Sequence, residues 1–505
     1  MNRDGVRKSI WQDEIKQLPA AININGIYDV AIIGGGITGV STAYRLQGSG
    51  KKCILIEAFN IGFGTTGGTT AHLNNFYDTT YAEAISKFGL SNAKLLARSA
   101  KEAMEIIETN ITDNDIDCDL QKKSAHLFAL DDKQKKQLED MIEGSEKVGH
   151  LMIPIQKISY PIPFTKAVEI PGQGQFHPIK YIGGLSNAFL NAGGTIVENC
   201  RCDSHSEEGN LIVLNTSRGV IKAKSVVYAT HIPPGISRLH FTNSPYRSYA
   251  MAFTLRNGDY PAELGYDLMD PYHYYRVHEV NGEKLLIAGG EDHKTGHADD
   301  TGECFSMLEN YVREYFDVDL VKYSWSSQYY EPVDGLPYIG KLPGTKNIFT
   351  ATGFRGNGMM FGTLSSKVIS DLILTGSSDY ERLFDPSRVD PIAGLTEFVK
   401  ENISVVGDFI KDKLFMEKIA SLSEVNDGAG KVVKYEGESY ALYKESKGKI
   451  HLLKSTCPHA RCEVRWNGAE LSWDCPCHGS RFGIDGKVLT APSVKDLIKV
   501  NEKNV

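Results

Sequence analysis

Hydrophobic and polar positions change their spacing along the chain, and each spacing predicts a different element. Residues 30–33 form an apolar run that is followed by a glycine turn, a helical pattern to about residue 47, and a second apolar run at 53–56. This order predicts strand, turn, helix and strand. Residues 80–109 place apolar side chains at helical spacing, which predicts a long amphipathic helix.

Later segments follow a β pattern. Residues 248–256 (SYAMAFTLR) and 283–292 (EKLLIAGGED) alternate as half-buried strands do. Three short runs follow near the C-terminus, GKVVKYEG, SYALYKES and KIHLLKS. The first pair predicts an antiparallel sheet, and the last three predict a small separate β domain.

The glycine turn has the spacing of a dinucleotide-binding motif. Gly34, Gly36 and Gly39 form G-x-G-x-x-G between the first strand and the helix, and Glu57 ends the second strand about 20 residues later. Such glycines let the backbone approach a pyrophosphate at the helix N-terminus, while the acid accepts the ribose hydroxyls. A tight turn without a ligand is the alternative.

Two further glycine-rich segments favour FAD over NAD. Residues 62–72 (GFGTTGGTTAH) follow the acid and are placed to continue along the phosphates towards a flavin. Residues 334–362 run as a strand, a second glycine turn and a helix. The N-terminus of that helix can direct its dipole towards the flavin edge that carries negative charge after reduction.

Composition limits the class of protein. The chain has 505 residues, 41% hydrophobic and 23% charged, with a net charge of −8. These values are typical of an ordinary multidomain globular protein and argue against a nucleic-acid partner. The first residues lack the apolar run of a signal peptide, no segment is apolar enough to span a membrane, and most cysteines are scattered. We therefore expect a cytoplasmic protein.

The C-terminal region carries a dense set of metal-ligand residues. Cys457 and His459 form one pair, and Cys475 and His478 form a second. Two thiolates and two imidazoles suit either a tetrahedral zinc site or a Rieske [2Fe–2S] cluster. A zinc site with four ligands leaves the neighbouring Cys462 and Cys477 unexplained, which favours iron.

The same region closely resembles the Rieske family. Its two boxes are matched by CPHARC and CPCHGS. The resemblance implies Cys457, His459, Cys475 and His478 as cluster ligands, with Cys462 and Cys477 joined in a disulfide bond. The chain departs from the family in having Arg461 inside the first box, and in having Phe482 where high-potential members have a tyrosine.

Taken together, the motifs resemble the D-amino acid oxidase superfamily of FAD-dependent oxidoreductases, in its branch with a C-terminal Rieske domain. Residues implied as FAD contacts are Gly34, Gly36, Ile37, Thr38, Gly39, Glu57, Gly64, Thr65, Thr66, Gly353, Gly356, Asn357, Gly358 and Met359. Gly68 stands where the branch often has a histidine, and related enzymes attach flavin through a histidine in this loop. No cysteine lies between Cys304 and Cys457 to serve instead. Both cofactors, FAD and the [2Fe–2S] cluster, are expected, with FAD bound non-covalently.

The resemblance also implies the fold class: an α/β, Rossmann-like FAD domain with an α+β substrate domain, followed by an all-β Rieske domain. The expected FAD domain comprises 25–80, 165–240 and 335–378, and the substrate domain 81–164 and 241–334. A helical connector is expected at 379–421 and the Rieske domain at 422–505.

Catalytic candidates come from the strand and turn nearest the predicted flavin. Tyr274 and Arg276 share one strand face at period two, and Arg355 lies in the last glycine turn. Either arginine would serve as an anion clamp for a substrate carboxylate. A surface ion pair is the alternative for Arg276.

These features predict FAD-dependent oxidation of a small amine or amino acid at a C–N bond. Electrons would pass from FAD to the Rieske cluster and on to an external one-electron acceptor. Two rival hypotheses are an oxygen-using amine oxidase with a structural Rieske domain, and a redox sensor or electron-transfer protein without turnover.

Overall fold

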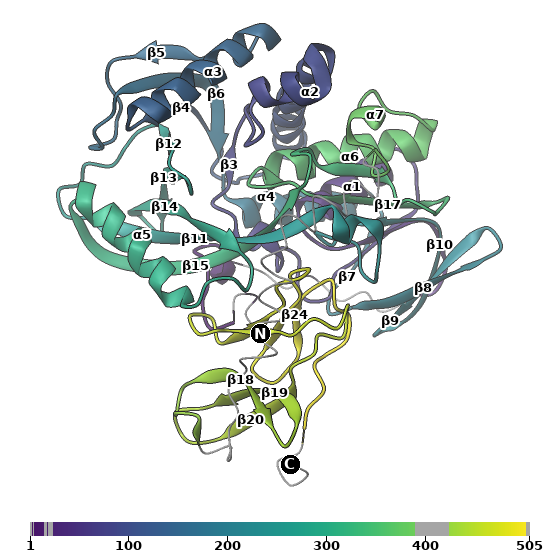
Figure 1. Cartoon of the computed structure of the whole chain (residues 1–505). Coiled ribbons are helices and arrows are strands. Elements are labelled where there is room, and N and C mark those ends of the chain that lie inside the picture. The colour runs from purple at the N-terminus through teal and green to yellow at the C-terminus, as the bar shows by residue number, and fades with distance from the viewer. Residues whose placement is uncertain (1–2, 4, 15–17, 19–23, 389–423, 501–505) are drawn as a thin grey trace.

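The computed structural model describes residues 3, 5–14, 18, 24–388 and 424–500. Two large sheets lie beside each other, and a smaller β part, drawn in yellow and olive, lies below them (Figure 1). Within the described residues, every helix is too short or too polar to cross a lipid bilayer. The expected connector at 379–421 lies mostly outside these residues; α7 (Glu381–Phe384) is the helix described there.

The first large sheet has eight strands and contains the glycine motif. Its main path is β16-β17-β10-β1-β2-β7, extended by a β8–β9 hairpin. β1 pairs in parallel with both β10 and β2. The strands are β1 (Ile27–Ile33), β2 (Cys53–Ile56), β7 (Thr195–Val197), β8 (Cys202–Glu208), β9 (Leu211–Thr216), β10 (Gly219–Tyr228), β16 (Tyr338–Lys341) and β17 (Ile348–Thr352).

Continuous apolar runs in this sheet are explained by burial on both faces. Val30 and Ile32 belong to one hydrophobic core, while Ala31 and Ile33 belong to another on the opposite face. The helices that contribute to the first core include α1 (Ile37–Gly48), α4 (Pro178–Asn191) and α6 (Gly358–Thr375). A parallel strand covered on both faces needs apolar residues at successive positions.

The second large sheet has nine strands, in the order β15-β11-β14-β13-β12-β4-β6-β3, with β5 paired to β6. β6 belongs to this sheet, so the expected FAD segment 165–240 is divided between the two sheets. The strands are β3 (His72–Leu73), β4 (Gln121–Ala129), β5 (Ile153–Ile155), β6 (Lys166–Gln175), β11 (Asn243–Leu255), β12 (Leu264–Asp267), β13 (Tyr274–Val280), β14 (Glu283–Lys294) and β15 (Val318–Pro332). Helix α5 (Thr301–Tyr315) packs against β11 and β14, and α3 (Asp132–Val148) packs against β4. Helix α2 (Tyr81–Asp113) packs against α3 and α6.

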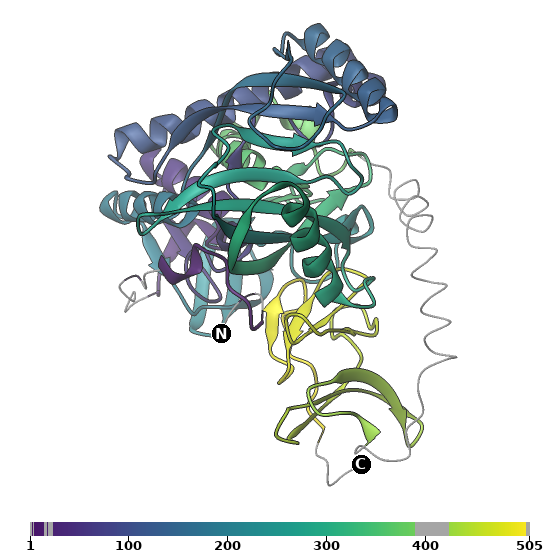
Figure 2. The same ribbon diagram turned by 90° about the vertical axis from the view of Figure 1, so that its left-hand side faces the viewer.

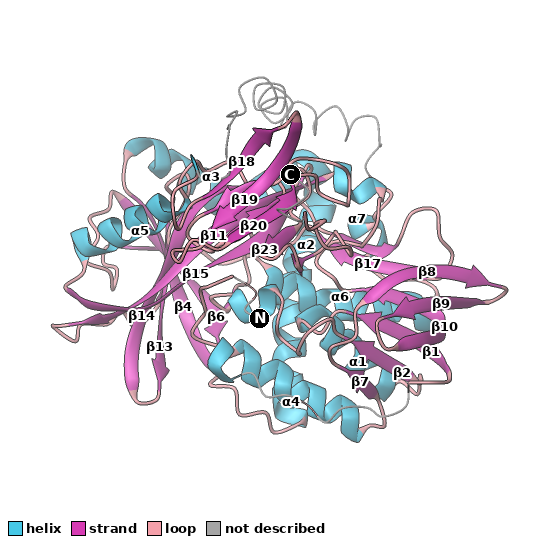
Figure 3. Ribbon diagram, turned by 90° about the horizontal axis from the view of Figure 1, so that it is seen from below, coloured by secondary structure: helices cyan, strands magenta, loops and turns pink. Residues whose placement is uncertain are grey.

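The C-terminal part consists of two small antiparallel sheets, as the short β runs predicted. One has three strands, β18 (Gly430–Tyr435), β19 (Glu438–Lys444) and β20 (Ile450–Lys454). The other has four, β21 (Arg465–Asn467), β22 (Ser472–Asp474), β23 (Arg481–Gly483) and β24 (Val488–Thr490). In Figure 2 the four-stranded sheet lies against the body and the three-stranded sheet lies farther away. Figure 3 shows the same part from below, across the two large sheets.

A buried ion network joins the C-terminal part to the nine-stranded sheet. Arg247 of β11 donates to both carboxylate oxygens of Glu470, at 2.8 and 2.7 Å. Arg481 of β23 donates to Glu470 and, at 3.0 Å, to Asp474. All three of Arg247, Glu470 and Arg481 are at most 1% exposed. Such charges are retained in a protein interior only when paired, so the two parts are fixed against each other.

The N-terminal segment lies at the same junction. Val6 N–H donates to the Glu470 carbonyl oxygen at 3.1 Å, and Arg3 accepts a hydrogen bond from Arg481 at its carbonyl oxygen, at 3.1 Å. Gly5 has a φ of 68°, and a Cβ there would overlap the Glu470 carbonyl. Only glycine suits this position, because both the backbone angle and the space exclude a side chain.

Candidate functional site

One cavity of about 1030 Å³ is lined by residues from both large sheets and from the C-terminal part. All of the predicted FAD contacts line it except Gly39 and Gly353. Those that do are Gly34, Gly36, Ile37, Thr38, Glu57, Gly64, Thr65, Thr66, Gly356, Asn357, Gly358 and Met359. Residues far apart in the sequence are therefore brought to one cavity.

Gly39 and Gly353 shape the cavity from behind its wall. A Cβ at Gly39 would overlap the Gly34 carbonyl oxygen, so glycine allows α1 to pack closely on β1. Gly353 has a φ of 77°, and a Cβ there would lie 2.6 Å from Asn243 Oδ1. Both glycines are required by packing and not by contact with the cavity.

Two helix N-termini face this cavity. Neither Gly36, which precedes α1, nor Asn357, which precedes α6, caps its helix with a side-chain hydrogen bond. At α1, the Thr66 hydroxyl accepts from Ile37 N–H at 3.0 Å. Helix N-termini carry partial positive charge and exposed N–H groups, which suits a pyrophosphate at one and an electron-rich ring at the other.

Glu57 closes the nucleotide end of the cavity. Its carboxylate accepts from Gly35 N–H at 2.7 Å and from Phe59 N–H at 2.9 Å. Burial raises the pKa of Glu57, while these two hydrogen bonds oppose the shift. The carboxylate is thus held in a fixed orientation at the end of β2, where ribose hydroxyls are bound in this motif.

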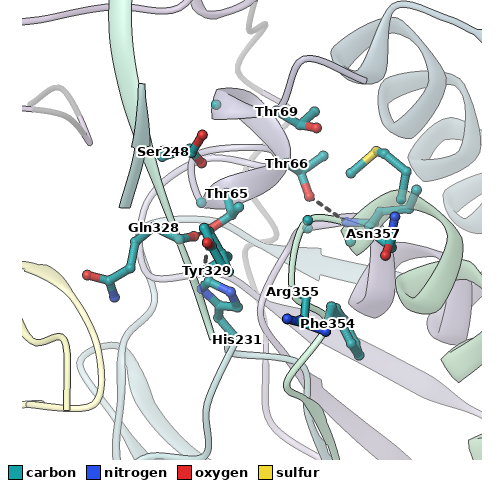
Figure 4. A pocket seen from close by; sticks show the side chains of 18 of the residues that line it. Thr65, Thr66, Thr69, His231, Ser248, Gln328, Tyr329, Phe354, Arg355 and Asn357 are labelled. Atoms are coloured by element: carbon teal, nitrogen blue, oxygen red, sulfur yellow. Dashed lines mark hydrogen bonds between the residues drawn. The ribbon is translucent and has the colours of Figure 1, made fainter. Parts of the chain in front are cut away.

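The threonine loop lies against a strand that sequence reasoning did not select. Thr65 Oγ1 donates to the Gln328 carbonyl oxygen at 3.3 Å and lies 3.3 Å from His231 Nδ1. Figure 4 shows Thr65, His231 and Gln328 together on one side of the cavity, with Thr66 and Asn357 on the other. Burial lowers the pKa of His231 to about 3, so its ring is neutral.

Of the three catalytic candidates, Arg276 does not line the cavity. Its Nη1 donates to the carbonyl oxygens of Thr70, Ala71 and Phe176 at 2.7, 2.9 and 3.2 Å. The guanidinium is fully buried. A side chain so engaged cannot clamp a substrate carboxylate, so the structure gives Arg276 a supporting position instead.

Tyr274 and Arg355 do line the cavity. Tyr274 OH lies 2.8 Å from Ser248 Oγ. Arg355 has a φ of 50°, donates to Thr79 Oγ1 at 3.0 Å and forms an ion pair with Glu331. Its positive charge is therefore already compensated by a carboxylate of the chain.

In the C-terminal part, two loops bring the predicted cluster ligands together. The rings of His459 and His478 have centroids 5.0 Å apart. A hydrogen bond from the Cys475 thiol lowers the pKa of Cys457, which places the two sulfur atoms beside each other. His459 Nε2 donates to the Gly235 carbonyl at 2.8 Å, while its Nδ1 is buried and has no hydrogen-bond partner among the described residues. Nδ1 is therefore the nitrogen left for a metal.

Cys462 and Cys477 form a disulfide bond between these loops. Their sulfur atoms also lie near Cys475 Sγ, and all three are within 4.8 Å of one another. That trio is not a ligand set, because cysteines in a disulfide have no thiolate to offer a metal. The donor set that fits is two thiols and two imidazoles, as a Rieske cluster requires.

The second loop contacts the cavity wall directly. Gln328 lines the cavity, and its side-chain nitrogen donates to the Gly479 carbonyl oxygen at 2.9 Å. Tyr330, two residues later on β15, donates to the His478 carbonyl oxygen at 2.9 Å. The Tyr330 ring also packs edge-on against His231, with centroids 4.7 Å apart. β15 thus touches the cavity and the ligand loop within three residues.

Comparison with known proteins decides the family. Residues 29–372 match the DAO family, described as FAD dependent oxidoreductase, and residues 416–501 match the Rieske [2Fe-2S] domain. The chain belongs to the FAD-dependent oxidoreductase family. It carries a Rieske domain in addition, and its cofactors are FAD and a [2Fe–2S] cluster.

Individual relatives agree with this family. The chain is similar to YhfW of Bacillus subtilis (strain 168), named for a Rieske 2Fe-2S iron-sulfur centre, with 32% identity over 94% of this chain and 93% of that protein. It is 26% identical to the gamma-glutamylputrescine oxidoreductase of Escherichia coli (strain K12), over 73% of this chain and 87% of the relative. Glycine oxidase from Geobacillus kaustophilus has the same fold, with a TM-score of 0.60 and 19% identity over 72% of this chain and all of that one.

Proposed function

We propose that this FAD-dependent oxidoreductase oxidises the C–N bond of a small amine or amino acid and passes the electrons to an external one-electron acceptor. When bound, FAD supplies a two-electron acceptor for the substrate, and the cluster supplies a one-electron relay to the outside. The residues of the chain bind the two cofactors, hold them near each other and shape the substrate space.

The junction along β15 carries the proposal. Gln328 lines the cavity and donates to Gly479, while Tyr330 donates to His478. These two hydrogen bonds connect the flavin side of the molecule to the loop that holds two predicted ligands. A Rieske domain that served only as a structural appendage would not need its ligand loop at this position.

The names of the relatives leave the substrate class open. One relative is named for gamma-glutamylputrescine, which is an amine, and a structural neighbour is named for glycine, which is an amino acid. Both classes undergo the same bond change, loss of a hydride from the carbon next to nitrogen. Water then hydrolyses the imine to a carbonyl compound and a smaller amine.

An anaerobic titration tests this function. Purified protein holding FAD and two irons is mixed with single amines and amino acids, while flavin absorbance and the electron paramagnetic resonance signal of the reduced cluster are recorded. We expect flavin bleaching followed by the cluster signal. Stoichiometric peroxide under air with no cluster signal would instead identify an oxidase with a structural Rieske domain. A flavin that no compound bleaches would identify a redox sensor.

A further inference from the structure

Five neighbouring strands of the nine-stranded sheet each place at least one residue on the cavity wall. In the order β15, β11, β14, β13 and β12, the wall includes Tyr329, Ser248, Asp292, Tyr274 and Tyr266. Figure 4 shows Tyr329 and Ser248 on the same side of the cavity as Thr65. This sheet face forms a wall of tyrosines with one carboxylate at its centre.

Close backbone contact holds the tyrosines in place. A Cβ at Gly289 of β14 would overlap the Tyr274 ring, so this ring lies directly across the neighbouring strand. Tyr272, two residues before the start of β13, packs beside the Tyr274 ring, with ring centroids 5.8 Å apart. Tyrosine faces attract cations, more strongly where water is excluded.

Asp292 has an unused acceptor atom on this wall. Its Oδ2 accepts from Tyr329 OH at 2.9 Å. Its Oδ1 is buried and has no hydrogen-bond partner within the part of the chain that the structure describes. A buried carboxylate oxygen without a donor is costly, and an N–H group of a ligand would satisfy it. Asp78, another carboxylate that lines the cavity, already accepts from Gly356 N–H at 2.7 Å.

Among the described residues, the arginines in or near the cavity wall already have partners on the chain, and so offer no comparable site for an anion. Arg276 is engaged by three carbonyls and Arg355 by Glu331. Besides Arg355, the arginines that line the cavity also have partners on the chain: Arg3 donates to Ser326 O, Arg201 to Asp203, and Arg481 to Glu470 and Asp474. Lys133 is exposed on α3. A bidentate clamp for an α-carboxylate needs a guanidinium whose fork is open.

We propose that this site takes a cationic amine without an α-carboxylate, and that Asp292 binds its ammonium group and removes one proton from it. In that step the N–H bond breaks and an O–H bond forms on Asp292, which leaves a neutral amine beside a neutral acid. The inference rests on the proposed function, because only the neutral amine can lose a hydride from the adjacent carbon.

A matched pair of inert ligands tests the charge preference. tert-Butylammonium and pivalate share the tert-butyl group, carry opposite charges and have no hydrogen on the carbon next to the functional group. Binding is followed in the FAD-loaded protein by the shift of oxidised-flavin absorbance. We expect tert-butylammonium to bind and pivalate not to bind. Asp292→Asn should weaken tert-butylammonium by about tenfold or more, because a hydrogen bond to a charged group is lost.

Two further variants act as controls. Asp292→Glu keeps the charge and should keep the preference for the cation, which separates a charge effect from misfolding of the Asn variant. Asp317→Asn changes an exposed residue before β15. It should give the same result with each ligand as the unmodified protein. Pivalate binding better than tert-butylammonium, or unchanged affinity in Asp292→Asn, would overturn the inference.

Flavin reduction by real substrates distinguishes failure of this inference from failure of the proposed function on which it rests. Putrescine and N-methylputrescine represent cationic amines, and glycine and sarcosine represent α-amino acids. If the two cationic amines bleach the flavin and the two amino acids do not, both proposals are supported. If the two amino acids bleach the flavin and the two cationic amines do not, the proposed function stands and the role of Asp292 is refuted. If neither pair nor the wider amine panel bleaches the flavin, the proposed function is wrong. Binding of the inert ligands still tests the charge preference of Asp292, because it does not depend on turnover.

Discussion

Tyr330 OH donates a 2.9 Å hydrogen bond to the backbone carbonyl of His478, a predicted ligand of the cluster. The histidine edge of the ligand set therefore faces the oxidoreductase part. His240 of the short helix η3 (Arg238–Phe241) agrees with this orientation, because its ring lies 4.7 Å from that of His459 and 5.5 Å from that of His478. Electrons coming from the flavin side would meet this edge first.

Removal of His478 should separate substrate oxidation from electron exit. In His478→Ala the cluster loses a ligand, while the glycine segments around the cavity are unchanged. We expect anaerobic flavin bleaching at close to the normal rate and loss of turnover with cytochrome c as acceptor. Dichlorophenolindophenol, which can take electrons from the flavin directly, should restore turnover.

The matched control is His451→Ala, on β20 away from the ligand loops, which should behave normally in both assays. Normal turnover of His478→Ala with cytochrome c would show that the cluster is not the exit. The structural-appendage hypothesis would then replace the relay.

The rate of flavin reduction should fall on the acid side of neutrality. Burial raises the pKa of Asp292 to about 7, with Asp78 acting in the same direction, while Ser248, Tyr329 and His273 lower it. Below that pH the carboxyl group is protonated and cannot accept the substrate proton. His72, whose ring packs against that of Tyr274, does not titrate in this range, since burial lowers its pKa to about 3.

Stopped-flow flavin reduction between about pH 5 and pH 9 measures this dependence. Asp292→Asn should be slower throughout and should lack the acidic limb near pH 7. An acidic limb that persists in Asp292→Asn would assign the titration to another group and contradict the role proposed for this residue.

The junction between the two parts should depend on Glu470. Glu470→Gln leaves Arg247 and Arg481 buried with insufficient negative charge around them. Removing one partner from a buried ion pair costs about 3–5 kcal/mol of unfolding free energy. We expect a lower urea midpoint and a Rieske part that becomes sensitive to protease before the rest of the chain.

Glu438→Gln supplies the comparison for that variant. Glu438 also pairs with a cation, Lys454 at 2.9 Å, but on the exposed surface of the same domain. Surface pairs contribute little, so this variant should unfold as the original protein does. Equal effects from the two substitutions would show that the buried network does not hold the junction.

Phe482 should keep the cluster potential below that of Rieske proteins with a tyrosine at this position. Phe482 is fully buried in the same core as Cys457 and Cys475 and has no hydrogen to donate to their sulfur atoms. Phe482→Tyr should raise the midpoint by about 40 mV, if one hydrogen bond favours the reduced cluster by about 1 kcal/mol. Protein-film voltammetry measures the shift, and an unchanged or lower midpoint would contradict it.

FAD should be released when the protein is denatured in acid. Gly68 lacks the side chain through which related enzymes attach flavin, and a Cβ there would overlap the Arg3 guanidinium. We expect all yellow colour in the supernatant after precipitation with trichloroacetic acid. Colour that stays with the pellet would indicate a covalent link from another residue of the chain.

Local motifs were predictable from the sequence, whereas the substrate wall was not. The residues of G-x-G-x-x-G and of the two Rieske boxes are close in the chain, and their spacing alone carries the chemistry. Asp292 and Tyr329 meet because β15, β11 and β14 are neighbours, an order that no spacing along the chain reveals. The family comparison and the C-terminal sheets confirm the expected fold class.

Arg276 illustrates the limit of strand periodicity. Period two predicts that it shares the face of β13 that carries Tyr274, but Tyr274 lines the cavity and Arg276 does not. The guanidinium lies 5.5 Å from the ring of Trp11 and donates to Thr70 and Ala71. Those partners come from distant segments, so the pattern gave the direction of the side chain without showing what covers it.

The contact between Val6 and Glu470 also orders events during synthesis. A ribosome releases residue 6 long before residue 470, so this segment waits for most of the chain before its hydrogen bond to the Glu470 carbonyl can form. Other contacts of the N-terminal segment do not have to wait, because Ser9 and Trp11 donate to the carbonyl oxygens of Gly67 and Thr69. The hydrogen bond that joins this segment to the Rieske part is thus completed only after the C-terminal residues have been made.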